Sequence, residues 1–568
     1  MVTLSAKQSE IVNDKAGKFV VRACPGSGKT FCVSARLARL ISGWKEKHQG
    51  IAAISFTNVA WQEIEKKYKE EFEIGKKISY PHFIGTIDAF INKFIFLPYG
   101  HLILKCKGRP TLVGEPHGIW TGKYFSDGLF DNISYKIDGS LYALNKSRMR
   151  SGWETNDAII RSKKNLNKGG FATQSDANYF AMKILEAFPQ IAKAIALRFP
   201  FLIVDEAQDT SDIQMKIIDL LIANGLSEVM LVGDPDQAIF EWNDARPDLL
   251  TQKFNDWSES VILNENRRSS QRICNFTYNI SSLTEASASV SDDVRSFTYQ
   301  PKVIVYNQDL PQIVASFIEE CTQNGIAISE ESVSVVFRSR NIMNEITGIP
   351  EVPSGSSPWV THDNYTKDFA KGKFLYDNGD FKSGFKSIER AIVKQMGNLS
   401  FCSEENIDNA INKIGYINFK TQIFRFIGLM PKTNIPLGNW VDTTNGVLQA
   451  NNINFQLGIT TAGRSYSFQQ VFMSESEKIV DRNYHMGTVH SVKGETFDAT
   501  LLILKTKGIG KAYKTILNEG VSISSNEELR ITYVGMTRAR KILVIAVPND
   551  ENKRVWEQRL NANNVLPN

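Results

Sequence analysis

Cysteine and histidine are scarce in this chain of 568 residues. Its six cysteines include no C-x-x-C pair, so neither a disulfide framework nor a cysteine-ligated zinc or iron–sulfur site is indicated. Its seven histidines have no metal-ligand spacing. No uninterrupted apolar run comes near the ~20 residues that cross a bilayer, and the opening MVTLSAKQSEIV has no apolar centre of a signal peptide. We therefore expect a reduced, cytoplasmic protein that does not interact with a membrane.

The composition is that of an ordinary globular protein, with 42% hydrophobic and 22% charged residues and a net charge of +5. The length allows several domains, each with its own core. Positive charge is concentrated in KSRMRSGWETNDAIIRSKKNLNK (146–168), where seven basic residues stand against Glu154 and Asp157. Two interpretations of this segment stay open, a solvated surface and a DNA-facing patch.

A phosphate-binding loop is predicted near the N-terminus, in FVVRACPGSGKT (19–30). The apolar residues 19–21 predict a buried strand, and the apolar spacing after Thr30 predicts a helix that opens at Lys29. The turn between them is rich in glycine, so that backbone N–H groups can point into one concavity at the positive end of the helix. The pattern G-x-x-x-x-G-K-[ST] is complete except at its first position, which is Ala23.

This loop predicts a site for ATP and Mg²⁺. Lys29 is expected to reach the β- and γ-phosphates, and the Thr30 hydroxyl is expected to bind Mg²⁺. The alternative is a glycine turn that only joins a strand to a helix, and the strand–loop–helix context speaks against it. The residues expected to cradle the phosphates are Ala23, Cys24, Pro25, Gly26, Ser27 and Gly28.

The second half of an ATP site is predicted in FLIVDEAQDTSDIQ (201–214), where two carboxylates follow an apolar strand. Asp205 is placed to hold Mg²⁺, and Glu206 to orient and deprotonate the attacking water. Hydrolysis of a phosphoanhydride needs little more than a metal, a positioned water and cations on the γ-phosphate. The two segments together predict an ATPase.

Strands and helices alternate in two series along the chain, and each series is interrupted once. The second interruption opens with the Pro/Ser/Gly-rich GIPEVPSGSSPWV (348–360). We predict an α/β protein with two parallel-sheet domains, each carrying a largely helical insertion. The predicted ranges are 1–95 and 197–259 for the first domain, 96–196 for its insertion, 260–346 and 483–568 for the second domain, and 347–482 for its insertion.

Nine segments occur in the order of the helicase motifs of superfamily 1A. They are ACPGSGKT, ISFTN, GTIDAF, DEAQDTSDIQ, VGDPDQAIFEW, NENRRSSQRI, VVFRSRN, TVHSVKGETFD and EELRITYVGMTRAR. On these residues the chain resembles the UvrD/Rep/PcrA helicases over nearly its whole length, apart from the two insertions. The resemblance implies two RecA-like P-loop domains, 1A and 2A, with insertions 1B and 2B, and the activity of an ATP-hydrolysing 3′→5′ DNA helicase.

The resemblance also implies roles at the nucleotide. Gln8 in SAKQSEI would read the adenine edge, and Gln237 in GDPDQ would sense the γ-phosphate and couple it to DNA. Arg268 and Arg538 would reach the γ-phosphate as arginine fingers. Three more residues are expected at the nucleotide: Arg267, Gly494 and Glu495.

On the DNA side, the resemblance implies that Trp242 is the platform on which a base stacks. Stacking tolerates any base, as a sequence-independent motor requires. The other expected contacts with a single strand are Phe56, Thr57, Asn58, Gly85, Thr86, Arg338, Thr488 and His490.

Four positions depart from the pattern of this family. Asp88 replaces a histidine and cannot favour a phosphate, and Phe240 lacks the hydroxyl of the usual tyrosine. Arg267 replaces the tyrosine that packs on adenine, although a guanidinium can also stack. Thr496 stands where an acid is usual, with Glu495 displaced by one position. None of these changes removes the chemistry of Mg²⁺, water and the γ-phosphate.

Two functions from different classes remain open. The first is an ATP-dependent translocase that moves 3′→5′ on single-stranded DNA and unwinds duplex or junction DNA, in repair or in defence against phage. The second is a nucleotide- and DNA-sensing subunit that gates a partner nuclease and scarcely unwinds. The segment 169–211 and the variant HSVKGETFD resemble the compact GajB-like helicases of Gabija-type phage-defence systems, in which the helicase accompanies an OLD/TOPRIM-type nuclease.

Overall fold

The computed structural model describes residues 4–72, 77–114, 117, 132–144, 157–239, 244–307, 309–338, 340–347, 356–360, 365–399, 402, 404–472, 483–504 and 521–561. The chain divides into two compact units. Unit 1 comprises Met1–Tyr306, Asn324–Ile326 and Val489–Asn568, and unit 2 comprises Asn307–Gln323 and Ala327–Thr488.

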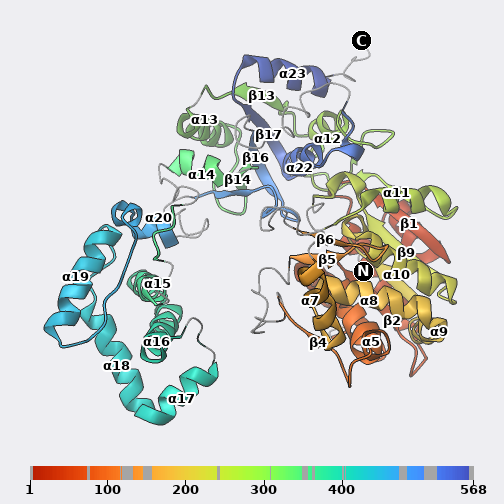
Figure 1. The fold of residues 1–568 in the computed structure, drawn as a ribbon. Helices are drawn as coiled ribbons and strands as arrows, with labels where there is room; N and C mark the ends of the chain where they lie inside the picture. The colour runs from red at the N-terminus through yellow and green to blue at the C-terminus, as the bar shows by residue number, and fades with distance from the viewer. Residues whose placement is uncertain are drawn as a thin grey trace. The chain divides into compact units, whose positions relative to one another are not determined.

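A six-stranded parallel sheet forms the centre of the N-terminal part of unit 1 (Figure 1). The order of its strands is β10-β1-β9-β8-β2-β3. Their bounds are Lys18–Ala23 (β1), Ile51–Ser55 (β2), Phe83–Thr86 (β3), Phe201–Val204 (β8), Glu228–Gly233 (β9) and Val261–Leu263 (β10). A parallel sheet with helices on its faces is the arrangement that the alternating strands and helices predict, and it confirms the α/β class.

Both faces of this sheet are covered, because alternate side chains of each strand point to opposite sides. Val20 on β1 packs in the core that includes residues of α8 and α10. Its neighbours Phe19 and Val21 pack in a second core with residues of α2 and α3. The helices of this part are α1 (Ala6–Ser9), α2 (Lys29–Ser42), α3 (Asn58–Glu71), α4 (Ile87–Ile91), α8 (Gln174–Ala187), α9 (Pro189–Arg198), α10 (Asp212–Ala223) and α11 (Pro247–Asp256).

The predicted strands are present, but one of them belongs to a different sheet than the sequence suggested. The segment 260–268 was assigned to the second α/β series, yet β10 pairs with β1 in the first sheet, with Val21 opposite Val261. A three-residue strand carries no information about its partner, because that choice depends on which edge is open when the domain packs.

The first insertion mixes helices with short strands. Its described elements are α5 (Leu97–Leu104), β4 (Thr111–Leu112), β5 (Ile133–Tyr135), β6 (Leu141–Ala143), α7 (Asp157–Lys168) and β7 (Phe171–Ala172). Within the basic segment 146–168, Lys163 is fully buried and pairs with Asp176 at 2.8 Å. Lys163 is therefore neither a solvated nor a DNA-facing charge, whereas Arg161, Lys164 and Lys168 are exposed.

One helical stretch, Ile87–Leu104, is long and apolar enough to cross a membrane when judged by length and composition. It contains Asp88 and Lys93, and 44% of it is buried inside the protein. Phe90, Ile91 and Phe96 of this stretch belong to the core of unit 1. The core helix of a globular protein passes the same test, so this stretch is weak evidence for a membrane.

The C-terminal part of unit 1 contains three parallel strands in the order β13-β17-β16. They are β13 (Lys302–Val305), β16 (Phe497–Ile503) and β17 (Ala539–Val547). The other elements of this part are β11 (Glu265–Asn266), α12 (Gln271–Tyr278), β12 (Ala288–Ser289), α22 (Glu527–Met536) and α23 (Asp550–Asn561).

Unit 2 is mainly helical, as predicted for the second insertion. Its helices α15, α16, α18 and α19 pack around Trp440, whose side chain is fully buried. Two parallel strands, β14 (Val333–Phe337) and β15 (His485–Thr488), also lie in this unit. The helices are α13 (Leu310–Gln323), α14 (Arg340–Thr347), α15 (Thr366–Asp377), α16 (Phe381–Gly397), α17 (Glu404–Ile414), α18 (Tyr416–Leu429), α19 (Leu437–Ala450) and α20 (Phe468–Phe472).

Candidate functional site

Three neighbouring strands of the six-stranded sheet end in the segments predicted to bind ATP. The phosphate-binding loop follows β1, residues 234–237 follow β9, and Asp205 and Glu206 follow β8. Because parallel strands place their carboxyl ends at one edge, these segments lie together in the position where open α/β sheets bind ligands.

The phosphate-binding loop has the backbone that its glycines predict. Gly26 and Gly28 have φ angles of 70° and 79°, and Gly28 caps the N-terminus of α2. A Cβ atom at Gly26 would lie 2.5 Å from Arg268 Cβ, so the loop tolerates only glycine there. The Gly26 carbonyl also accepts a hydrogen bond from Arg267 N at 2.8 Å. Two of the expected nucleotide residues are therefore packed directly on this loop.

The loop residues around these glycines are largely enclosed. Ala23 is the last residue of β1, and Cys24 N donates to the Leu263 carbonyl at 2.9 Å. Ser27 is 1% exposed, and no described residue bonds its hydroxyl. Pro25 precedes Gly26 in the loop, and Thr30 lies in the first turn of α2, beside Lys29.

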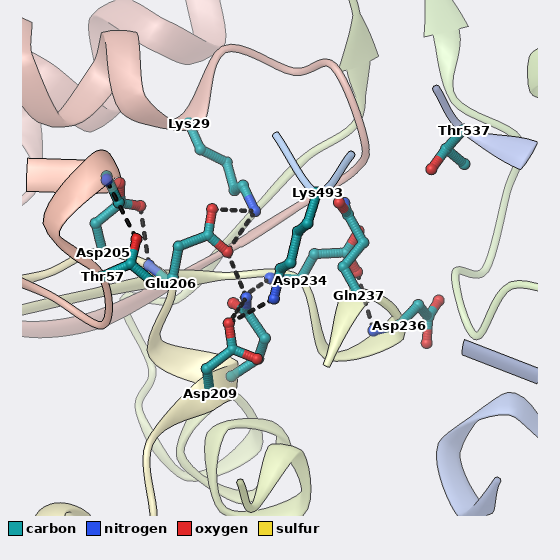
Figure 2. Close-up of polar contacts among 12 residues, drawn as sticks. Lys29, Thr57, Asp205, Glu206, Asp209, Asp234, Asp236, Gln237, Lys493 and Thr537 are labelled. Atoms are coloured by element: carbon teal, nitrogen blue, oxygen red, sulfur yellow. Dashed lines mark hydrogen bonds and ion pairs between the residues drawn. The ribbon is translucent and has the colours of Figure 1, made fainter. Parts of the chain in front are cut away.

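Lys29 lies among carboxylates that come from two segments, one after β8 and one after β9 (Figure 2). Its Nζ is 3.4 Å from the Glu206 carboxylate. Burial alone would lower the pKa of Lys29, but the nearby charges of Glu206, Asp234 and Asp205 raise it above the ordinary value. Lys29 is therefore a fixed positive charge at the end of the phosphate-binding loop.

The two carboxylates after β8 differ in how easily they ionise. Burial and the negative charge of Glu206 raise the pKa of Asp205. Burial also opposes the ionisation of Glu206, but Lys29, Lys493 and the Gln208 amide outweigh it and hold the pKa of Glu206 below its usual range. The pKa of Glu206 is thus the lower of the two, so Glu206 ionises before Asp205.

Lys493 and Asp209 complete this cluster, and neither was singled out in the sequence. Lys493 Nζ lies 2.6 Å from Asp209 Oδ2, although 284 residues separate them. Gln208 Nε2 donates to the carboxylates of Glu206 and Asp209, and Gln208 Oε1 accepts from Asp234 N at 3.0 Å. Lys493, Asp209, Gln208 and Asp234 stand inside the motif segments VKGE, DEAQD and GDPDQ. Their place in these motifs is the sequence signal for the cluster, although the motifs assign them no role.

The two predicted arginine fingers lie near the same cluster, with Arg538 buried and Arg268 half-buried. Arg538 is 1% exposed, and its Nη2 donates to Gln237 Oε1 at 3.1 Å. Arg268 Nη1 donates to the Thr537 carbonyl at 2.9 Å. Burial lowers the pKa of both guanidinium groups, and for Arg538 the neighbouring charge of Arg268 adds to the effect.

Gln237 connects Arg538 to the Asp234 carboxylate. Its Nε2 donates to Asp234 Oδ2 at 2.6 Å, while its Oε1 accepts from Arg538. Burial, followed by the charge of Asp236, raises the pKa of Asp234. Gln237 is thus held by a partner on each end of its amide.

The remaining expected nucleotide residues lie at two further places. Gln8 Oε1 accepts from Ser5 N and from Arg267 Nη2, both at 3.1 Å, and Gln8 Nε2 is buried with no partner among the described residues. Gly494 has a φ angle of 97°, and the Glu495 carbonyl accepts from Arg538 Nη1 at 3.3 Å. The Glu495 side chain itself is exposed.

Predicted DNA contacts follow β2 and end β3, the next strands along the same sheet edge. Thr57 and Thr86 cap helices α3 and α4, accepting hydrogen bonds from Ala60 N and Ala89 N. Asn58 is exposed and accepts from the Trp61 indole. Phe56 and Gly85 are the neighbours of these caps, with Phe56 half-buried.

The other predicted DNA contacts are divided between the two units. Arg338 follows β14, and Thr488 ends β15 opposite Phe337, so unit 2 brings these two positions together. His490 lies in unit 1, where its carbonyl accepts from Lys493 N at 3.4 Å. Trp242 and Phe240 lie outside the described residues.

Asp88 departs from the family pattern in its contacts as well as its charge. Its Oδ1 accepts from Asn178 Nδ2 and Gln214 Nε2, both at 3.0 Å. Burial raises the pKa of Asp88 despite these two donors. The carboxylate thus joins α4 to α8 and α10, beside the expected DNA contact at Thr86.

Comparison with known proteins agrees with this geometry. The family model "UvrD/REP helicase N-terminal domain" matches residues 4–104 and 142–258, and "UvrD-like helicase C-terminal domain" matches residues 469–550. The chain is 24% identical to the ATP-dependent DNA helicase Rep of Buchnera aphidicola over 95% of this chain and 93% of that protein. It is 23% identical to a probable DNA helicase II homolog of Mycoplasma pneumoniae over 95% of this chain and 83% of that protein.

A shorter match relates the chain to DNA helicase II of Haemophilus influenzae, with 27% identity over 48% of this chain and 39% of that protein. The two family models cover more than half of the chain in the order of one helicase. The matched ranges include the phosphate-binding loop, residues 205–214, residues 234–237 and Arg538. The chain therefore belongs to the UvrD/Rep family of ATP-dependent DNA helicases.

Proposed function

We propose that this protein is a 3′→5′ translocase on single-stranded DNA that uses Mg-ATP hydrolysis to separate duplex or junction DNA. The observation that carries the proposal is the convergence of Lys29 and Glu206 from the first sheet with Lys493 and Arg538 from the C-terminal segments. Cations and carboxylates buried together are what transfer of a phosphoryl group to water needs, because the protein's work there is positioning and charge stabilisation.

The residues present fit a magnesium ion. Asp205 is 1% exposed, and its Oδ2 is bonded by no residue in the described part of the chain. A carboxylate oxygen and a threonine hydroxyl are oxygen donors of the kind that Mg²⁺ takes together with nucleotide phosphates. We assign Asp205 and Thr30 to this ion, which when bound would neutralise charge on the phosphates.

The chain's own residues divide the remaining work. Glu206, ionised by its cationic neighbours, orients the attacking water and accepts its proton. Lys29 binds the β- and γ-phosphates, while Arg268 and Arg538 stabilise the charge that develops on the γ-phosphoryl group. Gln237, bonded to Asp234 and Arg538, senses whether that group is present. Loss of the γ-phosphate removes an anion shared by these cations, and this change drives the conformational step.

The DNA side of the proposal uses Trp242 as a stacking platform and the residues after β2, β3, β14 and β15 as contacts with the backbone. These are Phe56, Thr57, Asn58, Gly85, Thr86, Arg338, Thr488 and His490. A groove that combines backbone contacts with aromatic stacking binds single strands without regard to sequence.

ATP turnover with and without single-stranded DNA tests the proposal. We expect DNA to raise kcat, and Glu206→Gln to lower it by about 10³-fold, the scale for loss of a group that acts directly on the transition state. Turnover that ignores DNA, or that survives in Glu206→Gln, refutes the proposal. Glu186→Gln, a change on the exposed side of α8, is the control.

A regulatory ATPase that gates a partner nuclease remains the second candidate. Its support is the resemblance to the GajB-like helicases of Gabija systems, together with Asp88, which puts a carboxylate where a DNA-contacting residue is expected. A bacterial cytoplasm is the setting we propose for either function, since the matched relatives are bacterial. A 3′-tailed duplex separates the candidates, because a motor releases the strand and a sensor hydrolyses ATP without release.

A further inference from the structure

A pair of serines after helix α12 holds the turn that carries Gln237. Ser281 Oγ and Ser282 N each donate to Asp236 Oδ2 at 2.8 Å, and Ser282 Oγ donates to Asp236 Oδ1. Asp236 is 1% exposed. A buried carboxylate without donors is strongly unfavourable, so these bonds fix where Asp236 lies.

A cation supports the second serine from the side of the phosphate-binding loop. Arg22 Nη2 donates to Ser282 Oγ at 2.6 Å, so that hydroxyl accepts from a guanidinium and donates to a carboxylate. Arg22 is on β1, next to Ala23, where the loop begins. The serine pair is thus bonded to the turn after β9 and, through Ser282, to the strand that precedes the phosphate-binding loop.

Three consecutive residues after β9 are held by later segments of the chain. The serine pair holds Asp236, Arg538 donates to Gln237, and Arg530 Nε donates to the Ala238 carbonyl at 2.7 Å. Asp236 and Gln237 share one short helical turn, Pro235–Gln237. A shift of the Asp236 carboxylate therefore moves the peptide unit that carries the Gln237 side chain.

We propose that Ser281 and Ser282 are positioning residues for γ-phosphate sensing: they anchor Asp236 and so set the place of Gln237. The inference rests on the proposed function in one respect, since it takes Gln237 as the sensor. Neither serine touches the nucleotide. Their effect is transmitted through the Asp236 carboxylate.

Nucleotide preference tests this role without relying on turnover. In full-length protein carrying Glu206→Gln, Kd for ATP and for ADP is measured with and without Ser281→Ala/Ser282→Ala. We expect the preference for ATP over ADP to fall about 10-fold, the scale for lost hydrogen bonds to a charged group. Ser282→Thr keeps the hydroxyl and is expected to retain the preference. Ser291→Ala is the control, because that hydroxyl bonds only the surface residue Asp293.

A second comparison shows whether the effect passes through Asp236. Asp236→Asn should lower the ATP preference by itself, and adding the serine changes to it should have little further effect, because coupled sites are not additive. If the serine variants weaken ATP and ADP equally, or add fully to Asp236→Asn, the role is merely structural and the inference is wrong. If the double variant does not fold, Ser282→Ala alone gives the same comparison.

The two proposals fail in different ways. Wild-type turnover that does not respond to DNA removes the proposed helicase function but leaves the ATP preference measurable. An unchanged ATP preference in the serine variants removes the positioning role but leaves DNA-stimulated turnover intact.

Discussion

The two ends of the six-stranded sheet edge differ in how far their predicted residues are buried and bonded to one another. After β1, β9 and β8, the predicted nucleotide residues are buried or half-buried and bonded to one another, Lys29 to Glu206 and Gln237 to Arg538. The pair Lys493–Asp209, which the sequence did not predict, lies in the same cluster. After β2 and at the end of β3, Gly85 is buried, but the other predicted DNA residues are exposed or half-buried, and Thr57 and Thr86 use their hydroxyls to cap helices.

This difference follows from what each end must do. Stabilising charge on a transferring phosphoryl group requires dipoles and cations that are already in place in a water-poor site. Binding a single strand of any sequence requires accessible surface, whose donors are completed by the strand itself. Substitutions at the first end are therefore expected to act on kcat and folding, and those at the second on the DNA concentration that is needed.

The largest effect is expected for Lys29→Ala. It removes the cation at the end of the phosphate-binding loop and leaves Glu206 without its 3.4 Å partner. We expect ATP turnover to fall by about 10³-fold, the scale for a transition-state contact. Lys18→Ala, at the exposed start of β1, is the control in the same assay. A fall of less than tenfold for Lys29→Ala contradicts the idea that this end is preorganised by charge.

The next largest effect is expected for Lys493→Met. The substitution removes one member of a buried ion pair and leaves Asp209 without its cation. We expect the free energy of unfolding to fall by about 3–5 kcal/mol. Urea unfolding of the full chain measures this, beside ATP turnover. Lys541→Met is the matched control, because Lys541 pairs with Asp498 in a more accessible place and about 1 kcal/mol or less is expected. Equal losses for the two lysines would show that the Lys493 pair acts as a surface pair.

A smaller effect, confined to DNA, is expected for Trp242→Ala. Loss of one stacked base weakens binding by about 1–3 kcal/mol, so the single-stranded DNA concentration that half-saturates stimulation should rise about tenfold or more. Trp257→Ala is the control, because this tryptophan packs against the core and its loss should lower stability instead. An unchanged half-saturation value would remove Trp242 from the DNA side.

The smallest effect is expected for Asp88→Asn, and its sign depends on pH. Because burial raises the folded-state pKa of Asp88 above its unfolded value, ionisation of this residue destabilises the fold as pH rises past the unfolded pKa. The amide should therefore raise Tm relative to wild type at pH 8 and have less effect at pH 4.

Asp138→Asn provides the opposite sign as a control. Hydrogen bonds from Ser140 hold the pKa of Asp138 below its usual range, so the ionised carboxylate stabilises the fold. Replacing this carboxylate with an amide should therefore lower Tm at pH 8. The same direction of change for both variants would contradict the burial argument for Asp88.

Local patterns predicted much of the fold and of the nucleotide site. The strand predicted in KFVVRA is β1, and the helix predicted to open at Lys29 is α2. Both depend on neighbours within a few residues, namely an uninterrupted apolar run and a glycine turn before an apolar helical face. The sequence could not predict the sheet to which β10 belongs or the contacts of Asp88, because each depends on which element packs against it.

By itself, the sequence determined where the chain turns from strand to loop to helix and which residue types stand at those turns, and it predicted that ATP is bound and hydrolysed there. Only the tertiary structure decided which charges neighbour one another. Lys493 meets Asp209, Arg538 meets Gln237, and Ser282 meets Asp236, across 284, 301 and 46 residues of chain. The reason is that a buried charge without a partner is very unfavourable. Its partner comes from whichever element packs beside it, so the spacing of the two residues along the chain does not predict the pair.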